Sequence, residues 1–271
     1  MPKVIMVVLD GLRFDVAVSS MGYPVHLVEK SKGALYKVQS ELPSLSRVLY
    51  EVLLTGTPSW QNGITANHVV RLSNQTSIFH LCKQNGLRTA AAADYWISEL
   101  YQQVPFEFFE HREQHDESKP IQHGKFYYES EYPDAHVFAD AEFLRKRYDP
   151  HFLFIHTMGI DDAGHKHTFD SKPYRAKARE AGSLLALLLP RWMEEGYEVI
   201  ITADHGMNPD GAHGGTTEGE REVPLFCYGS RFRPGHHEAI IPQLGIAPLV
   251  CELLGIPPSS QMGAAPSILK S

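Results

Sequence analysis

Five short apolar runs, separated by helical patterns, constrain the fold of this chain more than any other feature. The first run covers residues 4–9, which are β-branched or aliphatic without interruption and end at Asp10-Gly11. Such a run is typical of a strand that is buried on both faces of a parallel or mixed sheet. Four later runs share the pattern: residues 89–93, 152–156, 198–202 and 223–228.

Helical patterns occupy the stretches between these predicted strands. Residues 46–54 place apolar side chains on one face, and residues 137–148 alternate apolar and charged side chains at helical spacing. A long helix is predicted over residues 172–195, where we expect Pro190 to kink or terminate it locally. Because strands and helices alternate, the predicted fold class is α/β. Two shorter helices are predicted over residues 78–84 and 247–254.

Residues 103–134 interrupt this alternation. They are rich in Phe, Tyr, Glu and His and show no clear period, so we predict an inserted cap or long loop. Its aromatic side chains either pin an irregular loop to the domain or form a lid that contacts substrate. The length of 271 residues suits one full-sized domain or two small ones, and we predict a single domain over residues 1–271.

The charge balance argues against a nucleic-acid polymer as partner. Lys and Arg number 25 against 32 Asp and Glu, so no surplus of cations is available to neutralise a phosphate backbone. No apolar run approaches the roughly 20 residues of a transmembrane helix, and the first run is too short for a signal peptide. The three cysteines form no CxxC pattern. We therefore expect a cytoplasmic protein that has no membrane span and no disulfide bond.

Histidine is frequent, with 15 residues, and several of them lie close to Asp in the sequence. The carboxyl ends of parallel strands meet at one edge of a sheet, so polar residues that follow the predicted strands should converge there. Buried carboxylates without cations cost several kcal/mol or become protonated, and carboxylate with imidazole is a ligand set for zinc or a similar ion. Taken singly, each residue could instead be a cap, a surface imidazole or a core residue. The residues in question are Asp10, Asp161, Asp162, His165, Asp204, His205 and His213.

Two serines at the start of the helix predicted over residues 46–54 form a second candidate site. Ser44 and Ser46 lie at the positive end of the helix dipole, where backbone N–H groups can hold an anion. A simple N-cap is the commoner role for Ser in this setting. The residues alone leave both roles open.

The order of motifs along the chain resembles the alkaline phosphatase superfamily. A strand ending in Asp-Gly is followed by Pro-Ser-Leu-Ser, Leu-Leu-Thr-Gly, Asn-Gly-Ile, Asp-x-x-x-His, Ala-Asp-His-Gly-Met, His-Gly-Gly and Val-Pro-Leu. Within the superfamily, the sequence is most similar to the type I phosphodiesterases and nucleotide pyrophosphatases. The resemblance covers residues 3–229 and continues over 245–257. It implies an α/β/α sandwich around a central, mostly parallel sheet, with a small inserted cap.

The resemblance also implies two metal sites and a hydroxyl nucleophile that bridges toward the second site. The family's nucleophile lies ten residues before the Gly of a Thr-Gly pair, and counting back from Gly56 gives Ser46, with Ser44 as the rival. The ions would be Zn²⁺ or Mn²⁺. The two implied ligand sets are Asp161, His165 and His213, and then Asp10, Asp204 and His205.

Other residues near these motifs are candidates for supporting roles. The family branch often has Pro-Asn soon after the nucleophile, whereas this chain has Val48 and Leu49. Arg47 is therefore the candidate substrate-binding residue, with a solvated arginine as the alternative. Three further residues could orient metal ligands or could simply be polar surface: His156, Asp162 and His167.

These features predict a metal-dependent hydrolase of phosphodiester or pyrophosphate bonds, nucleotides included, that acts through a phosphoseryl intermediate. Three carboxylate ligands against two divalent ions leave a positive site, which attracts a small phosphorylated substrate and stabilises a serine alkoxide. Tyr95 or Trp96 could stack on a base or could be ordinary packing. The alternatives are a phosphomonoesterase or phosphonate hydrolase on the same scaffold, or a non-catalytic binding protein. A sulfatase is disfavoured because no Cys/Ser-x-Pro-x-Arg motif surrounds Pro43.

Overall fold

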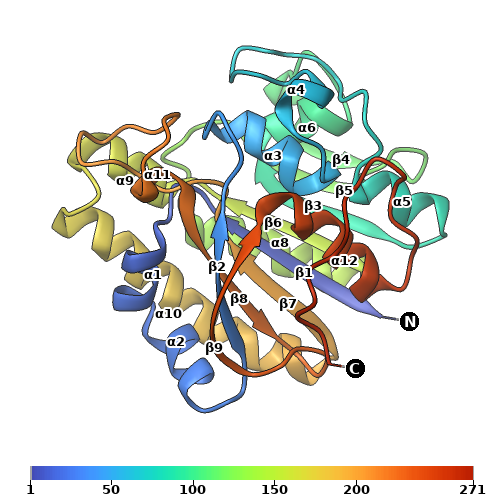
Figure 1. Ribbon diagram of the computed structural model, residues 1–271. Coiled ribbons are helices and arrows are strands. Elements are labelled where there is room, and N and C mark those ends of the chain that lie inside the picture. The colour runs from blue at the N-terminus through green and yellow to red at the C-terminus, as the bar shows by residue number, and fades with distance from the viewer. Residues whose placement is uncertain (1, 271) are drawn as a thin grey trace.

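The computed structural model describes residues 2–270, which contain one nine-stranded sheet with helices on both faces (Figure 1). The strand order is β4-β5-β3-β6-β1-β7-β8-β2-β9. Neighbours from β5 to β7 in this order are parallel, as are β2 and β9, which confirms the α/β class and a mostly parallel sheet. The strands are β1 (Lys3–Leu9), β2 (Ala34–Gln39), β3 (Thr89–Asp94), β4 (Glu113–His115), β5 (His123–Tyr127), β6 (Phe152–Thr157), β7 (Tyr197–Thr202), β8 (Glu222–Tyr228) and β9 (Gly235–Pro242).

The five strands predicted from apolar runs form the middle of the sheet. Strand β1 lies between β6 and β7, and Val7 aligns with Ile155 on one side and Ile201 on the other. Residues 4–9 are fully buried, because helices cover both faces of the sheet at this strand. The observed ends of β1, β3, β6, β7 and β8 differ from the predicted ends by one residue at most.

Four strands at the two edges of the sheet were not predicted. In β2, Lys37 breaks the apolar pattern, and its ammonium group lies 2.7 Å from the carboxylate of Glu222 on β8. Strand β9 at the outer edge is mostly exposed, so its sequence lacks an apolar run. On the other edge, β5 pairs with β3 and β4 pairs with β5. Part of the 103–134 segment therefore extends the sheet.

Helices form one layer on each face of the sheet (Figure 1). The first layer contains α1 (Phe14–Ser20), α2 (Gly22–Glu29), α8 (Asp134–Tyr148), α9 (Gly159–His167) and α10 (Lys172–Glu194). The second contains α3 (Ser46–Thr55), α4 (Ser59–Asn62), α5 (Ile78–Gln84), α6 (Tyr95–Tyr101) and α12 (Ile246–Leu254). Three short elements complete the fold: α7 (Phe108–His111), α11 (Glu218–Arg221) and the 3₁₀ helix η1 (Gln243–Gly245).

Helix α10 continues through Pro190 to Glu194, so the expectation that Pro190 terminates it is wrong. Proline removes one backbone hydrogen bond from a helix interior. Leu189 and Trp192, which flank Pro190, are fully buried. Their packing against the core holds the last turn of the helix in place despite the missing bond.

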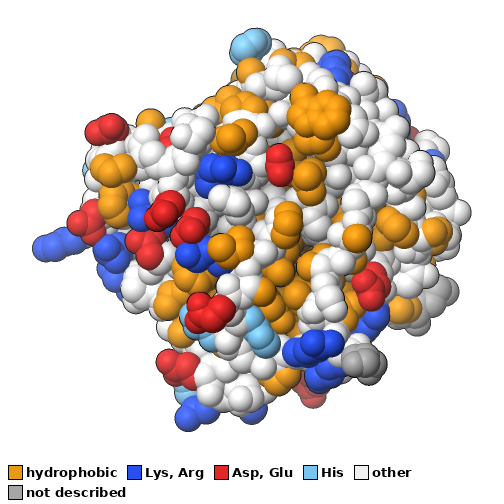
Figure 2. Space-filling model, in the orientation of Figure 1, with side chains coloured by type: hydrophobic (Ala, Val, Ile, Leu, Met, Phe, Trp, Pro, Cys, Tyr) orange, Lys and Arg blue, Asp and Glu red, His pale blue; other side chains and the backbone are white. Residues whose placement is uncertain are grey.

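Figure 2 shows one face of the molecule, on which acidic and basic side chains are interspersed among apolar ones. Among residues 2–270, no helix is both long enough and apolar enough to cross a membrane. Cys82, Cys227 and Cys251 are buried free thiols.

Candidate active site

The carboxyl edge of the parallel strands collects the predicted site residues. Asp10 directly follows β1, and Asp204 and His205 follow β7. Strand β6 leads into α9, which carries Asp161 and His165. Because β6, β1 and β7 are adjacent and parallel, the residues that follow them meet at one edge of the sheet.

Asp10, Asp204 and His205 form the first group that could hold a metal ion. Each offers a ligand atom within 4.8 Å of the others, and all three side chains are fully buried. The Nε2 atom of His205 lies 3.4 Å from Oδ1 of Asp10 and 3.3 Å from Oδ2 of Asp204. The structure thus brings together the residues of one predicted ligand set.

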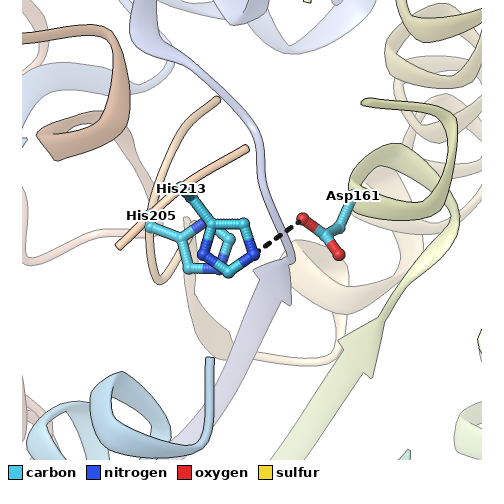
Figure 3. A group of neighbouring side chains, drawn as sticks. All are labelled: Asp161, His205 and His213. Carbon is cyan, nitrogen blue, oxygen red and sulfur yellow. Dashed lines mark ion pairs between the residues drawn. The ribbon is translucent and has the colours of Figure 1, made fainter. Parts of the chain in front are cut away.

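The second group contains Asp161, His205 and His213 (Figure 3). The two imidazole rings stack with centroids 3.7 Å apart, and Nε2 of His213 lies 3.8 Å from Oδ1 of Asp161. His165 also reaches this group, with its Nε2 atom 3.3 Å from Oδ2 of Asp161 and 3.1 Å from Nε2 of His213. The predicted set of Asp161, His165 and His213 is therefore assembled, with His205 between the two groups.

All three imidazoles have the same orientation toward the site. Each Nδ1 atom lies 2.8 Å from a backbone carbonyl oxygen, which can only accept a hydrogen bond, so Nδ1 carries the proton. In a neutral ring, Nε2 then presents a lone pair to the carboxylates. This arrangement is typical of histidines that bind metal through Nε2. The accepting carbonyls belong to Gly211 for His165, Gly206 for His205 and Ser44 for His213.

The buried carboxylates of the site are only partly satisfied by the protein. Three of their oxygens are buried and have no hydrogen-bond partner within residues 2–270: Oδ1 of Asp10, Oδ1 of Asp161 and Oδ2 of Asp204. Such oxygens cost free energy unless a cation or donor binds them. Three unpaired carboxylate oxygens beside three imidazole lone pairs fit the needs of two divalent ions.

The pKa values of the three buried carboxylates are shifted in different directions. Burial tends to raise the pKa of Asp10, but the hydrogen bond from His156 and the charge of His205 lower that pKa to about 2. Burial and the charge of Asp10 raise the pKa of Asp204 well above its usual range, and they also raise that of Asp161. The protein by itself therefore does not stabilise three ionised carboxylates here.

Asp10 is fixed from behind by two side chains. His156 places Nε2 3.1 Å from Oδ2 of Asp10, and the hydroxyl of Tyr50 donates to the same oxygen. His156 thus occupies the orienting position that was one of its two predicted roles. Asp162 pairs instead with Lys166 at 3.0 Å, and His167 is exposed beside it, so neither contacts a metal-ligand candidate.

Ser46 is the first residue of α3 and points into the site. Its Oγ atom lies 3.0 Å from Nε2 of His205, and the side chain is only 4% exposed. Ser44 has a different environment, because its hydroxyl donates to the carbonyl of Gly215 at 2.8 Å and accepts from the N–H of Gly214 at 3.1 Å. Of the two serines, only Ser46 lines the pocket described below.

Arg47 does not lie where a substrate contact was expected. Its side chain is 1% exposed, one guanidinium nitrogen lies 2.7 Å from Glu99, and the guanidinium stacks over Trp96 with its carbon 4.6 Å from the ring centroid. Arg47 is not among the residues that line the pocket. The structure therefore places it behind the pocket wall, where it supports Trp96.

A cavity of about 240 Å³ opens beside Ser46. One wall contains the metal-ligand candidates Asp161, His165 and His213. We call these three residues, together with the adjoining buried Asp10, Asp204 and His205, the metal-ligand wall. A second part of the lining, which we call the aromatic wall, consists of Asp94, Tyr95, Trp96 and Tyr128.

Asp94 and Asn67 are among the residues of this pocket that were missed in the sequence. Asp94 ends β3 as Asp10 follows β1, so the same pattern of a buried strand closed by Asp would have pointed to it. Asn67 lies in an irregular stretch without a recognisable motif. Its Oδ1 atom accepts a hydrogen bond from the backbone N–H of Arg47 at 3.1 Å, which places its amide next to Ser46.

The 103–134 segment contributes to the pocket and is also anchored to the core. Tyr128 is 49% exposed and packs on Tyr95 with ring centroids 4.6 Å apart. Phe126 and Tyr127, in contrast, are buried. The buried pair fits the anchoring role, and Tyr128 lies where it could contact a substrate.

Gly11 brings the two metal-ligand groups into direct backbone contact. It has a positive φ of +71°, and a Cβ atom at this position would lie 2.8 Å from Cα of Asp161. A side chain here would therefore be both strained and too close to α9. The turn after β1 packs against the start of α9 because residue 11 is glycine.

This fold and this set of residues define a member of the alkaline phosphatase superfamily. The chain belongs to the type I phosphodiesterase / nucleotide pyrophosphatase family, whose sequence model matches residues 4–213. Murine ectonucleotide pyrophosphatase / phosphodiesterase 5 has a similar fold, with a TM-score of 0.77 at 13% identity over 99% of this chain and 100% of that chain. The phosphonate monoester hydrolase of Silicibacter pomeroyi gives a TM-score of 0.65 at 12% identity, covering 98% and 76% of the two chains.

Curated relatives include longer proteins with a transferase name. The human GPI ethanolamine phosphate transferase 2, catalytic subunit, is 26% identical over 97% of this chain and 27% of its own length. The GPI ethanolamine phosphate transferase 2 of Candida albicans is 22% identical over 96% of this chain and 31% of its own length. This chain therefore spans about a third or less of these relatives.

Proposed function

We propose that this chain cleaves phosphodiester bonds with Ser46 as the nucleophile, at a site that holds two divalent metal ions. The observation that carries the proposal is the position of Ser46 Oγ, 3.0 Å from His205 Nε2 and beside three carboxylates with unpaired buried oxygens. The hydroxyl of Ser46 lines the cavity, whereas that of Ser44 is hydrogen-bonded to the backbone of Gly214 and Gly215. Membership of the phosphodiesterase family supports the reaction class.

The residues that would hold the ions are those of the two predicted sets. Asp161, His165 and His213 would hold one ion. The second ion would lie among Asp10, Asp204 and His205, close to Ser46. Bound Zn²⁺ or Mn²⁺ would lower the pKa of a hydroxyl and neutralise charge that develops on phosphate oxygens.

In the first step, the Oγ atom of Ser46 attacks phosphorus while the bond from phosphorus to one ester oxygen breaks. The serine loses its proton, and the departing alkoxide takes one up and leaves as an alcohol. The amide of Asn67 and the N-terminus of the ten-residue helix α3 can hold the remaining phosphate oxygens. In the second step, an incoming hydroxyl group attacks the phosphoseryl group and restores Ser46.

The acceptor in the second step separates two candidate functions. Water as acceptor gives hydrolysis, which is the function predicted from the sequence. An alcohol as acceptor gives phosphoryl-group transfer, and the names of relatives that match nearly the whole chain favour this second candidate. Supplying an alcohol in the assay and measuring the ratio of transfer product to hydrolysis product distinguishes the two.

The test of the proposed function compares bis-p-nitrophenyl phosphate with p-nitrophenyl phosphate in protein loaded with Zn²⁺ or Mn²⁺. Preference for the diester, loss of activity in Ser46→Ala and a phosphorylated Ser46 in acid-quenched samples are the expected results. Clear preference for the monoester would favour the phosphomonoesterase alternative, and a phosphonate monoester in the same assay tests the other one. The cytoplasmic location stays a prediction, which fractionation of cells that make the protein would test.

A further inference from the structure

The loop that follows β7 carries His213 and also orients His165. We call residues 206–217 the His213 loop, and we call the ligand candidates Asp161, His165 and His213 the Asp161 metal site. The Nδ1 atom of His165 donates to the carbonyl of Gly211, which belongs to the His213 loop, at 2.8 Å. The loop contains no helix or strand. Two of the three ligand candidates at this site therefore depend on the contacts that hold an irregular loop in place.

Glu220, in α11, holds the second half of the His213 loop with its side chain. The residue is only 3% exposed, and both carboxylate oxygens accept hydrogen bonds from the loop. Oε1 accepts from the backbone N–H of Gly215 at 3.0 Å. Oε2 accepts from the N–H of Thr217 at 3.1 Å and from its hydroxyl at 2.6 Å. Because Gly215 lies two residues after His213, this carboxylate fixes the main chain next to the ligand candidate.

Asn208 holds the first half of the loop and connects it to the same carboxylate. Its Oδ1 atom accepts from the N–H groups of Asp210 and Ala212 at 3.0 and 2.9 Å. Its Nδ2 atom donates to Oε1 of Glu220 at 3.4 Å, so both halves of the loop meet at Glu220. The backbone carbonyl of Glu220 also accepts from the N–H of Gly206 at 2.8 Å, a contact that a change of side chain leaves in place.

The contact between Glu220 and Gly215 is close. A Cβ atom at position 215 would lie 2.8 Å from Oε2 of Glu220, so a larger residue there would push the carboxylate away. Burial tends to raise the pKa of Glu220, but the hydrogen bonds from Thr217 and Gly215 lower it below its usual range. The carboxylate is therefore ionised at neutral pH, and its hydrogen bonds to the loop are stronger than those of a neutral acceptor.

The other group of ligand candidates is held by different contacts. Asp10 is fixed from behind by the two side chains described above, and the backbone carbonyl of Asp204 accepts from Nε2 of Gln243 at 2.6 Å. None of these contacts involves the side chain of Glu220. A change in that side chain should therefore act on the Asp161 metal site and not on the other one.

We propose that Glu220 is a positioning residue that sets the metal affinity of the Asp161 metal site without contacting the ion. This inference rests on the proposed function, because it concerns one of the two ions proposed there. The ionised carboxylate holds the His213 loop so that His213 faces Asp161 and the carbonyl of Gly211 stays within reach of His165. Residues that orient metal ligands in this way typically contribute roughly ten- to hundredfold to metal affinity.

Calorimetric titration of the metal-free protein with Zn²⁺ measures the two sites. The natural protein should bind two ions, and the step that weakens in His165→Ala belongs to the Asp161 metal site. In Glu220→Ala, the same step should weaken by about tenfold or more, and the other step should change by less than about twofold. Glu218→Ala is the matched control, because Glu218 lies in the same short helix but is exposed, and both steps should equal those of the natural protein.

Hydrogen exchange in the metal-free proteins tests the positioning without any ion. Amides of the His213 loop should exchange faster in Glu220→Ala than in the natural protein, whereas those of β1 and β7 should not change. Thr217→Val removes only the hydroxyl that donates to Oε2, so it should show both effects at smaller size even if Glu220→Ala does not fold. Thr217→Ser keeps this donor and should behave as the natural protein does.

The outcomes separate this inference from the proposed function. Two Zn²⁺ steps of natural affinity in Glu220→Ala would overturn the inference, and so would equal weakening of both steps, which indicates a general loss of structure. A weakened step without faster exchange in the His213 loop would also overturn it, because the carboxylate would then act through its charge alone. Failure of the natural protein to bind Zn²⁺ would instead contradict the proposed function.

Discussion

The side chains of the two pocket walls are held in place by different kinds of contact. The metal-ligand wall is held by the backbone, because each of its imidazoles donates to a main-chain carbonyl and Asp10 is fixed by Tyr50 and His156. The aromatic wall combines the start of α6 with Tyr128, which is 49% exposed. The first wall is thus tied to the main chain at each imidazole, whereas Tyr128 in the second wall is half exposed.

The walls also differ in the number of buried carboxylate oxygens that no positive charge neutralises. Within the part of the chain that the structure describes, three buried carboxylate oxygens of the metal-ligand wall have no hydrogen-bond partner, and in the aromatic wall the same holds for one oxygen of Asp94. In the proposed function, metal ions compensate the first wall. Changes in the first wall should then affect all substrates alike.

The largest expected effect comes from Ser46→Ala. Removing the nucleophile should lower kcat/KM by roughly 10³-fold or more for every diester, because no other hydroxyl takes its place. Steady-state kinetics with bis-p-nitrophenyl phosphate would measure this. Ser44→Ala is the matched control, since its hydroxyl bonds to the backbone of Gly214 and Gly215, and it should retain most of the activity. The opposite pattern would make Ser44 the nucleophile.

Arg47→Met tests the support behind the aromatic wall. It leaves the carboxylate of Glu99 buried without its partner, so the free energy of unfolding should fall by about 3–5 kcal/mol. Urea denaturation measures the change, and the double variant Arg47→Met/Glu99→Gln should recover part of it. A specific rise in KM without loss of stability would return Arg47 to the substrate-binding role predicted from sequence.

His165→Ala probes the metal-ligand wall with little risk to folding, because the side chain is 45% exposed. Loss of one ligand should weaken one of two metal sites by about tenfold or more, as seen by calorimetry with Zn²⁺. His167→Ala lies on the same helix but outside the site, so its metal binding should equal that of the natural protein. Equal binding by both variants would remove His165 from the ligand set.

The smallest effect concerns the stability of the metal-free protein and the charge on Asp94. Its pKa is raised to about 7 by burial, so the folded state binds a proton more tightly than the unfolded state does. The natural protein should therefore lose stability as pH rises through 7, whereas the asparagine in Asp94→Asn does not titrate. The stability advantage of Asp94→Asn should grow from pH 5 to pH 8. A constant difference would show that the carboxylate already has a partner.

Sequence patterns identified the metal-ligand wall better than the aromatic wall for a topological reason. Apolar runs predicted five strands, four of which, β3, β6, β1 and β7, are adjacent and parallel. The residues that follow parallel strands meet at one edge of the sheet. Asp10, Asp161, Asp204, His205 and His213 accordingly lie together. The aromatic wall depends on side-chain directions and on an irregular segment, which periodicity does not describe.

Arg47 shows that a residue next to a site residue in the sequence need not point into the site. Neighbouring residues on a helix point about 100° apart, because a turn contains 3.6 residues. When Ser46 faces the pocket, Arg47 therefore points behind it, toward Glu99 and Trp96. Asn67 shows the reverse case, since 20 residues separate it from Arg47 and yet the two share a hydrogen bond.

The glycine at position 11 has a consequence for protein engineering. Because Gly11 lets the turn after β1 touch the start of α9, the distance between the two metal-ligand groups is a property of the main chain. Grafting the Asp and His side chains onto another α/β scaffold would reproduce the ligands but not their spacing. A designer who wants this centre elsewhere should transplant the β1 turn and the first turn of α9 as one unit, and should hold residue 11 constant in any library.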